Sequence, residues 1–199
     1  MKKIVLILTV MCAVSSFAQK MKVTEGSIKN LKGIRQFDVI FEYHDLKIPK
    51  FDSEVAFLKE KMDKRETKNP GSGEKFKKTW FNDREERYHP MFLESFNKRF
   101  VNDMVSVTEN SDASYVIKIH TTKLYAGYNI GIVRHNAEID AIVTVYKKTD
   151  PTIILLEGTY RDVPGNGAFG NDYDSGFRIS HCYAKLGKNI ANYIRKKAK

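Results

Sequence analysis

Hydrophobic residues recur at every second position in several stretches of this chain, which is the pattern of strands with one buried face. Between Ala137 and Val145, for example, the odd-numbered positions are apolar, while Glu138, Asp140 and Thr144 lie between them. We expect the last three such strands to form an antiparallel meander. The alternating pattern predicts strands over residues 27–31, 35–43, 115–122, 137–145 and 153–160.

Apolar positions three or four residues apart mark the helices. A first helix is expected over about Ser53 to Thr67, with Asp52 or Ser53 as its cap and Val55, Leu58 and Met62 on its apolar face. A second is expected over about Glu74 to Tyr88. A last amphipathic helix is marked by Ile179, Tyr183, Leu186, Ile190 and Ile194.

Pro90 divides the middle helical segment, because proline lacks the amide that a helix interior uses. We expect the second helix to stop or kink at His89 and a third to begin there. Phe92, Phe96 and Phe100 form the apolar stripe of that third helix, with Leu93 and Met104 beside it. The stripe indicates a helix packed on a sheet.

The order of elements is strands, helices, a run of strands and a closing helix, and this grouping favours the α+β class. We predict a mainly antiparallel sheet of about four to five strands with helices packed on one face. Residues 19–199 are expected to form a single domain, since 181 residues supply one substantial core.

Residues 1–18 have the three parts of a secretory signal peptide. Lys2 and Lys3 precede an apolar run from Ile4 to Val14, and small residues follow, so cleavage is expected after Ala18. Cys12 follows Met11, whereas a lipid-attachment cysteine follows a small residue. We therefore expect a secreted protein of the periplasm without a lipid anchor, and no transmembrane segment, because no apolar run approaches about 20 residues.

The chain is basic, with 34 Lys and Arg against 24 Asp and Glu. Removal of Lys2 and Lys3 leaves 32 against 24, a net charge of +8. In an exported protein this charge favours an envelope protein or an anionic envelope component as partner, and not nucleic acid. Cys182 is the one cysteine after residue 18, so the domain cannot contain an internal disulfide.

Two short motifs carry a resemblance to envelope accessory domains. Residues 111–117 (Ser-Asp-Ala-Ser-Tyr-Val-Ile) enter an alternating strand, and Gly187-Lys188-Asn189-Ile190-Ala191 lies on the closing helix. These features resemble the N-terminal domain of TolB and the lipoprotein activators of penicillin-binding proteins. Residues 69–80 and 92–97 also resemble secreted bacterial proteins of unassigned function. The resemblance implies a scaffold for protein partners in the envelope and brings no catalytic residues with it.

A glycine-rich loop is the first candidate ligand site. Gly165, Gly167 and Gly170 match G-x-G-x-x-G, but Asp172 and Asp174 then place two negative charges where a phosphate would lie. No second parallel strand with an acidic residue follows. We therefore expect a surface loop without nucleotide chemistry and with no cofactor, although a casual carboxylate site stays open.

The second candidate site is a histidine pair. If the strands on either side of the predicted turn at Gly127 to Gly131 form a hairpin, His120 and His135 approach one another, and Asp140 or Glu138 could complete a metal site. Structural histidines on strands are the alternative. No other metal-ligand spacing is present, and the adjacent His181 and Cys182 diverge on a helix too far to act as a base and nucleophile pair.

The sequence favours a non-catalytic secreted envelope protein that binds another macromolecule. Two alternatives stay open. One is a small-molecule-binding or hydrolytic enzyme that uses residues 165–176. The other is a module that binds anionic lipid or glycan through lysines of the first two helices and the C-terminal tail.

Overall fold

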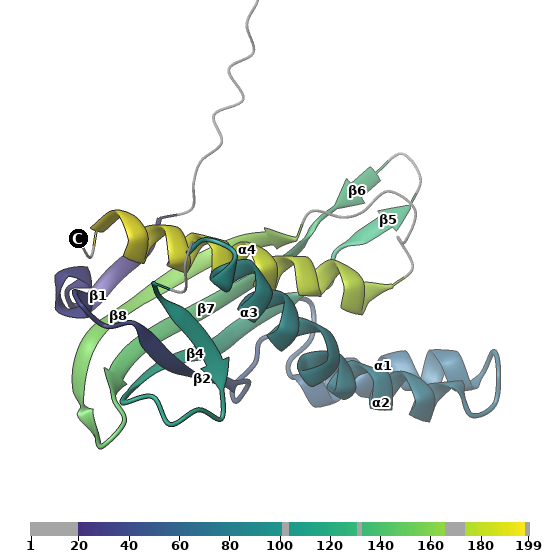
Figure 1. Ribbon diagram of the computed structural model, residues 1–199. Coiled ribbons are helices and arrows are strands. Elements are labelled where there is room, and N and C mark those ends of the chain that lie inside the picture. Colours follow the sequence, from purple (N-terminus) through teal and green to yellow (C-terminus); the bar gives the residue numbers. More distant parts are fainter. Residues whose placement is uncertain (1–19, 101–103, 131–132, 166–173, 198–199) are drawn as a thin grey trace, which may run out of the picture.

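A six-stranded sheet forms the centre of the protein, as seen in a computed structural model that describes residues 20–100, 104–130, 133–165 and 174–197 (Figure 1). Its strands, in spatial order, are β1 (Lys22–Gly26), β8 (Asp150–Gly165), β7 (Ala137–Lys147), β4 (Tyr115–Tyr125), β2 (Gln36–Glu42) and β3 (Ser106–Glu109).

The sheet is mostly antiparallel, which confirms the α+β class. β1, β8, β7 and β4 pair antiparallel, and the β4, β7 and β8 meander is as expected from the sequence. β2 pairs in parallel with both β4 and β3. The sheet has six strands, so the prediction of four to five was too low.

The undercount comes from two edge strands that carry no alternating signal. Every side chain of β1 is exposed, and β3 has four residues of which one, Val107, is buried. Edge strands such as these are held by backbone pairing with a neighbour, so their side chains need no periodic pattern.

The predicted strand at residues 27–31 is instead a 3₁₀ helix, η1 (Ile28–Leu31). The Ser27 hydroxyl accepts a hydrogen bond from the backbone amide of Lys29 at 3.3 Å, which caps this helix. Ile28 and Leu31 are buried because residues three apart share one side of a 3₁₀ turn.

Two helices cover one face of the sheet, α3 (His89–Asn97) and α4 (Ser175–Lys197), and they pack against each other (Figure 1). Phe92 and Phe96 of α3 are fully buried, as predicted, whereas Met104 lies outside that helix and is exposed. On the sheet side, β7 contributes Ala137, Ile139, Ala141, Val143 and Val145, all of them buried.

The other two helices, α1 (Glu54–Glu66) and α2 (Ser72–Asp83), pack on each other and project past the sheet (Figure 1). Ser53 caps α1 through the amide of Ala56 at 3.1 Å, so the predicted start of this helix is confirmed. Its predicted inner face holds for Leu58, which is buried, and for Met62, which packs partly buried against the core. Val55 is instead 76% exposed, and Phe57 is buried in its place.

The expected break at Pro90 is a widened turn, η2 (Arg84–Tyr88), a π-helix that joins α2 to α3. The amide of His89 donates to the carbonyl of Arg84, five residues back. This extra residue in the turn gives room to the proline ring, so the chain continues as helix where a strict α-helix would stop.

Beyond β4 the chain forms a small two-stranded sheet, β5 (Tyr128–Ile130) and β6 (Val133–His135). The segment from Gly127 to Gly131, expected to be a turn, therefore contains a strand. Among the described residues no helix is long and apolar enough to cross a membrane. Residues 1–18, the predicted signal peptide, lie outside the described residues.

Candidate functional site

The glycine-rich loop lies mostly outside the described residues, which exclude Gly167, Gly170 and Asp172. Gly165 is described, and it ends β8. A Cβ atom added there would lie 2.2 Å from the carbonyl oxygen of Arg178 on α4. The close approach of strand and helix thus accounts for glycine at this position without any ligand.

Asp174, which belongs to the candidate loop, caps α4 and forms an ion pair. Its carboxylate accepts a hydrogen bond from the Phe177 amide at 3.0 Å and lies 2.6 Å from the Arg87 guanidinium. Arg87 also lies 3.1 Å from Asp83, whose pKa is raised to about 6 by burial against the opposing effect of Arg87. These groups line a cavity of about 540 Å³, and Arg87 is already paired with carboxylates there.

His120 and His135 are not brought together, so the predicted histidine pair is wrong. Strand register places His120 opposite Ile142 on β7, whereas His135 lies opposite Tyr128 in the small sheet. The hairpin exists, but β4 runs several residues past His120 before the chain turns. Asp140, suggested as a further ligand, lies 3.1 Å from Lys123 instead.

His89 is a buried histidine that the sequence did not single out. Its Nδ1 lies 2.9 Å from Glu109, and its Nε2 lies 3.0 Å from the Tyr43 hydroxyl. Burial, and then the nearby Arg84 charge, lower the pKa of His89 to about 4. The neutral ring donates to Glu109 and accepts from Tyr43, so neither nitrogen is free for a substrate and the group holds β2, β3 and α3 together.

The thiol of Cys182 is fully buried on α4. Burial raises its pKa well above the ordinary range for a cysteine. A protonated, inaccessible thiol is neither a nucleophile nor a metal ligand.

A second cavity, of about 460 Å³, lies between η1, the end of α3 and the end of α4. We call it the arginine groove. The end of α4 that lines this cavity lies at the C-terminal end of the molecule, away from the α1 and α2 projection (Figure 1). Its apolar lining consists of Leu31, Ile34, Phe100, Met104, Val105 and Ile194.

Three guanidinium-bearing residues, Arg35, Arg99 and Arg195, complete the lining of the arginine groove. Among the described residues, none of the three forms an ion pair with an aspartate or glutamate, and none of the lining residues is acidic. Arg195 has a hydrogen bond to the neutral Asn192 side chain at 3.1 Å. An apolar floor beside uncompensated positive charge suits a ligand with a hydrocarbon part and an anionic head.

Sequence reasoning missed this groove because its walls come from three distant parts of the chain. Gly33 and Arg35 lie just before β2, Phe100 follows α3, and Ile194 lies near the end of α4. The three segments contribute four, four and two of the described lining residues, and no single segment carries a recognisable motif. The one local signal was the basic end of the last helix, Arg195-Lys196-Lys197, which by itself is also the charge that a helix C-terminus favours.

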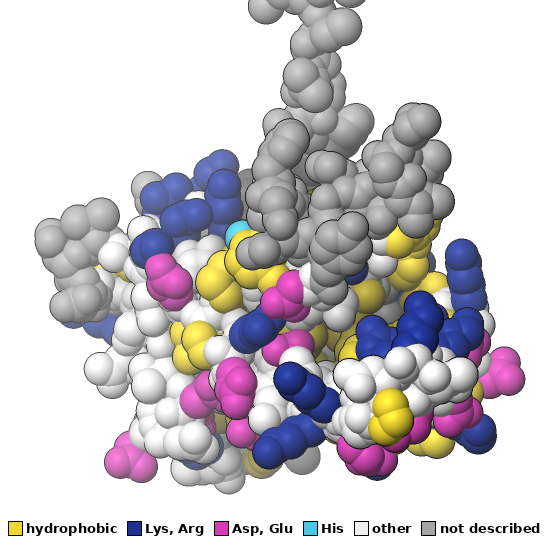
Figure 2. Space-filling model, turned by 90° about the vertical axis from the view of Figure 1, so that its right-hand side faces the viewer, with side chains coloured by type: hydrophobic (Ala, Val, Ile, Leu, Met, Phe, Trp, Pro, Cys, Tyr) yellow, Lys and Arg dark blue, Asp and Glu magenta, His cyan; other side chains and the backbone are white. Residues whose placement is uncertain are grey.

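The alternative of a module that binds anionic lipid or glycan requires lysines on the first helices that have no acidic partners. Two lysines of α1 do not meet this requirement. Lys59 lies 2.7 Å from Asp63, and Lys64 lies 2.7 Å from Glu60. Figure 2, which views the side of the molecule where α1 and α2 project, shows basic and acidic side chains interspersed over that face. Mixed charge of this kind creates no single-sign field for an anionic surface.

No family model and no curated protein matches this chain. Among solved structures, the chain is similar to a PelC dodecamer from Paraburkholderia phytofirmans, with 12% sequence identity over 84% of this chain and 96% of that one, at a TM-score of 0.36. An identity and a TM-score this low carry no information about what this chain binds.

Proposed function

We propose that this chain is an exported, non-catalytic binding protein of the cell envelope that holds an anionic acyl lipid in the arginine groove. The observation that carries the proposal is the set of three arginines, Arg35, Arg99 and Arg195, beside an apolar cavity whose described lining residues include no aspartate or glutamate. The acyl chain would occupy the apolar lining and the head group would take the guanidinium donors.

The choice of an acyl chain over a peptide follows from the polarity of the lining. Apart from the arginines, the groove is formed by aliphatic and aromatic side chains and Gly33. A peptide would bring backbone amides that need hydrogen-bond partners, and burying them unpaired costs on the order of 1–3 kcal/mol each. A hydrocarbon chain carries no such cost. The volume of about 460 Å³ falls in the range of small-ligand sites.

Two features support binding without catalysis. His89 has both ring nitrogens engaged in structural hydrogen bonds, and Cys182 is fully buried. Of the described residues, those that line the arginine groove include no histidine, cysteine, serine or carboxylate that would act as nucleophile or base. The basic charge of the chain also suits an anionic envelope component.

The test is a thermal-shift comparison on residues 19–199 with three probes kept below their micelle concentrations. Dodecyl phosphate is expected to raise the melting temperature saturably. At 100 times its dissociation constant the ligand stabilises the folded state by about 2.7 kcal/mol. Dodecyl maltoside, which has the same chain and a neutral head, and inorganic phosphate, which has no chain, are expected to give little shift. An equal shift with the maltoside would overturn the anionic preference, and no shift with any probe would overturn the proposal.

A further inference from the structure

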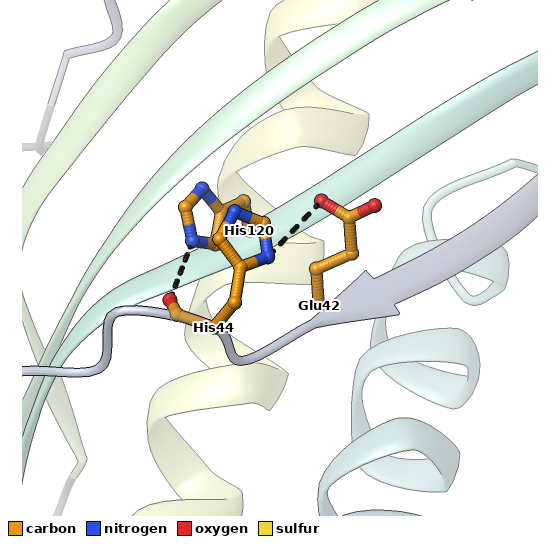
Figure 3. A group of neighbouring side chains, drawn as sticks. All are labelled: Glu42, His44 and His120. Atoms are coloured by element: carbon orange, nitrogen blue, oxygen red, sulfur yellow. Dashed lines mark hydrogen bonds and ion pairs between the residues drawn. The ribbon is translucent and has the colours of Figure 1, made fainter.

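Glu42, His44 and His120 form a side-chain cluster separate from the arginine groove (Figure 3). Glu42 ends β2 and lies directly opposite His120 in the parallel pairing of β2 with β4. His44 follows two residues later in a turn. One ligand atom of each residue, a ring nitrogen or a carboxylate oxygen, lies within 4.8 Å of the other two.

The cluster lies on the face of the sheet that α3 and α4 leave open. Phe41 and Tyr43 stack against His89 of α3, so Glu42 between them points to the opposite face. Thr121 bonds to Tyr183 of α4 at 2.7 Å, so the neighbouring His120 also points away from the helices. The His44 side chain is 57% exposed, which leaves the cluster open to ions from solvent.

A hydrogen bond fixes the tautomer of His120. Its Nε2 lies 2.9 Å from the backbone carbonyl of His44, and because a carbonyl only accepts, Nε2 carries the proton (Figure 3). In the neutral ring the lone pair is then on the other nitrogen, Nδ1. Metal-binding histidines in proteins commonly have one ring nitrogen held in this way by a carbonyl.

The two imidazole rings stack, with centroids 3.8 Å apart and planes 21° from parallel (Figure 3). Lone pairs of stacked rings run side by side, so one ring must turn for both to reach the same ion. His44 is the ring free to do so, since it is exposed and lies in a turn. Its Nδ1 is 3.8 Å from Glu42.

The ammonium group of Lys118 lies beside the Glu42 carboxylate, where a bound metal ion would also lie. Its Nζ lies 3.5 Å from Oε2 of Glu42, and both side chains are about one third exposed. A metal ion bound to Glu42 would have to compete with this ammonium group. Removal of the Lys118 charge is therefore expected to strengthen metal binding.

We propose that Glu42, His44 and His120 bind a divalent transition-metal ion, with Zn²⁺ as the best-suited species. Two imidazoles and one carboxylate are borderline and hard donors of the kind that zinc takes at about 2.0–2.2 Å. Three protein ligands leave a fourth position open to water. The inference is independent of the lipid site, since no residue is shared between the two.

Isothermal titration of residues 19–199 with zinc chloride tests this site. We expect one ion per chain, and at least about a tenfold loss of affinity in His44→Ala and in His120→Ala. His135→Ala is the matched control, because His135 is exposed on β6 outside the cluster, and its affinity is expected to equal that of the unaltered chain. Circular dichroism of each variant verifies that the fold is retained.

The Lys118→Gln variant is expected to bind zinc with a lower dissociation constant than the unaltered chain. Nonspecific binding to exposed histidines would not give this result. Stronger binding at lower proton concentration is also expected, because protons compete for the imidazole nitrogens. Absence of saturable binding in the unaltered chain would overturn the inference. So would a loss in His135→Ala as large as that in His120→Ala, or no gain of affinity in Lys118→Gln.

Discussion

Gly187 of α4 packs directly against the backbone of Phe92 on α3. A Cβ atom at Gly187 would lie 2.5 Å from the Phe92 carbonyl oxygen, closer than real Cβ contacts allow. This is the glycine of the Gly187-Lys188-Asn189-Ile190-Ala191 motif, and its role in this chain is to let the two covering helices approach each other.

Gly187→Ala is therefore expected to destabilise the protein by about 1–2 kcal/mol. Overpacking of this kind costs about 1–3 kcal/mol, and the better helix propensity of alanine returns up to about 1 kcal/mol. Urea denaturation measures the change. Lys188→Ala, at the exposed neighbouring position, is the control and is expected to stay within about 0.5 kcal/mol. A Gly187→Ala variant as stable as the control would mean that the helices are further apart.

Phe96→Ala is expected to lower the free energy of unfolding by about 3–5 kcal/mol, because Phe96 is fully buried between α3 and the rest of the core. Phe81→Ala serves as comparison, since Phe81 is 39% exposed on α2, and its loss is expected to be less than half as large. Denaturant unfolding monitored by circular dichroism gives both values. Equal losses would contradict the assignment of Phe96 to the core.

His89 is expected to stay neutral at pH 5.5 in the folded protein. Its folded pKa is lowered from 6.5 to about 4, so below pH 6.5 the unfolded chain binds a proton that the folded chain does not. Stability is thus fully present above about pH 6.5 and falls as the pH drops toward 4, by on the order of 2 kcal/mol between pH 7 and pH 5.

Imidazole nitrogen chemical shifts measured by NMR at pH 5.5 test the neutral state of His89 directly. In urea titrations at pH 7 and pH 5, His89→Gln should remove the part of the acid destabilisation that this ring causes. An imidazolium signal for His89 at pH 5.5 would show that Glu109 governs its charge more than burial does.

The parts of the fold that the sequence predicted are those with a periodic apolar face. β7 shows strict alternation along its buried side, and α3 places Phe92 and Phe96 four residues apart. β1 escaped prediction because every one of its side chains is exposed and only its backbone pairs with β8. Periodicity reports burial of side chains, so a strand held by its backbone alone has no such signal.

The candidate sites were harder to predict because they depend on how distant segments meet. The sequence predicted His135 as the neighbour of His120, whereas the neighbours in the structure are Glu42 and His44, which the parallel pairing of β2 with β4 brings beside it. A sequence gives no local evidence for a parallel neighbour. The same limit applies to the arginine groove, whose arginines come from three separate parts of the chain.

The central claim is that the arginine groove binds an anionic acyl lipid through its three arginines. Titration calorimetry of dodecyl phosphate into the unaltered protein and into the double variant Arg35→Gln, Arg99→Gln tests it most directly. We expect at least about a tenfold weaker dissociation constant in the double variant, equivalent to about 1.4 kcal/mol. Added salt is expected to weaken binding more in the unaltered protein than in the double variant, which keeps Arg195. Unchanged affinity in the double variant, with the same salt response, would contradict the claim.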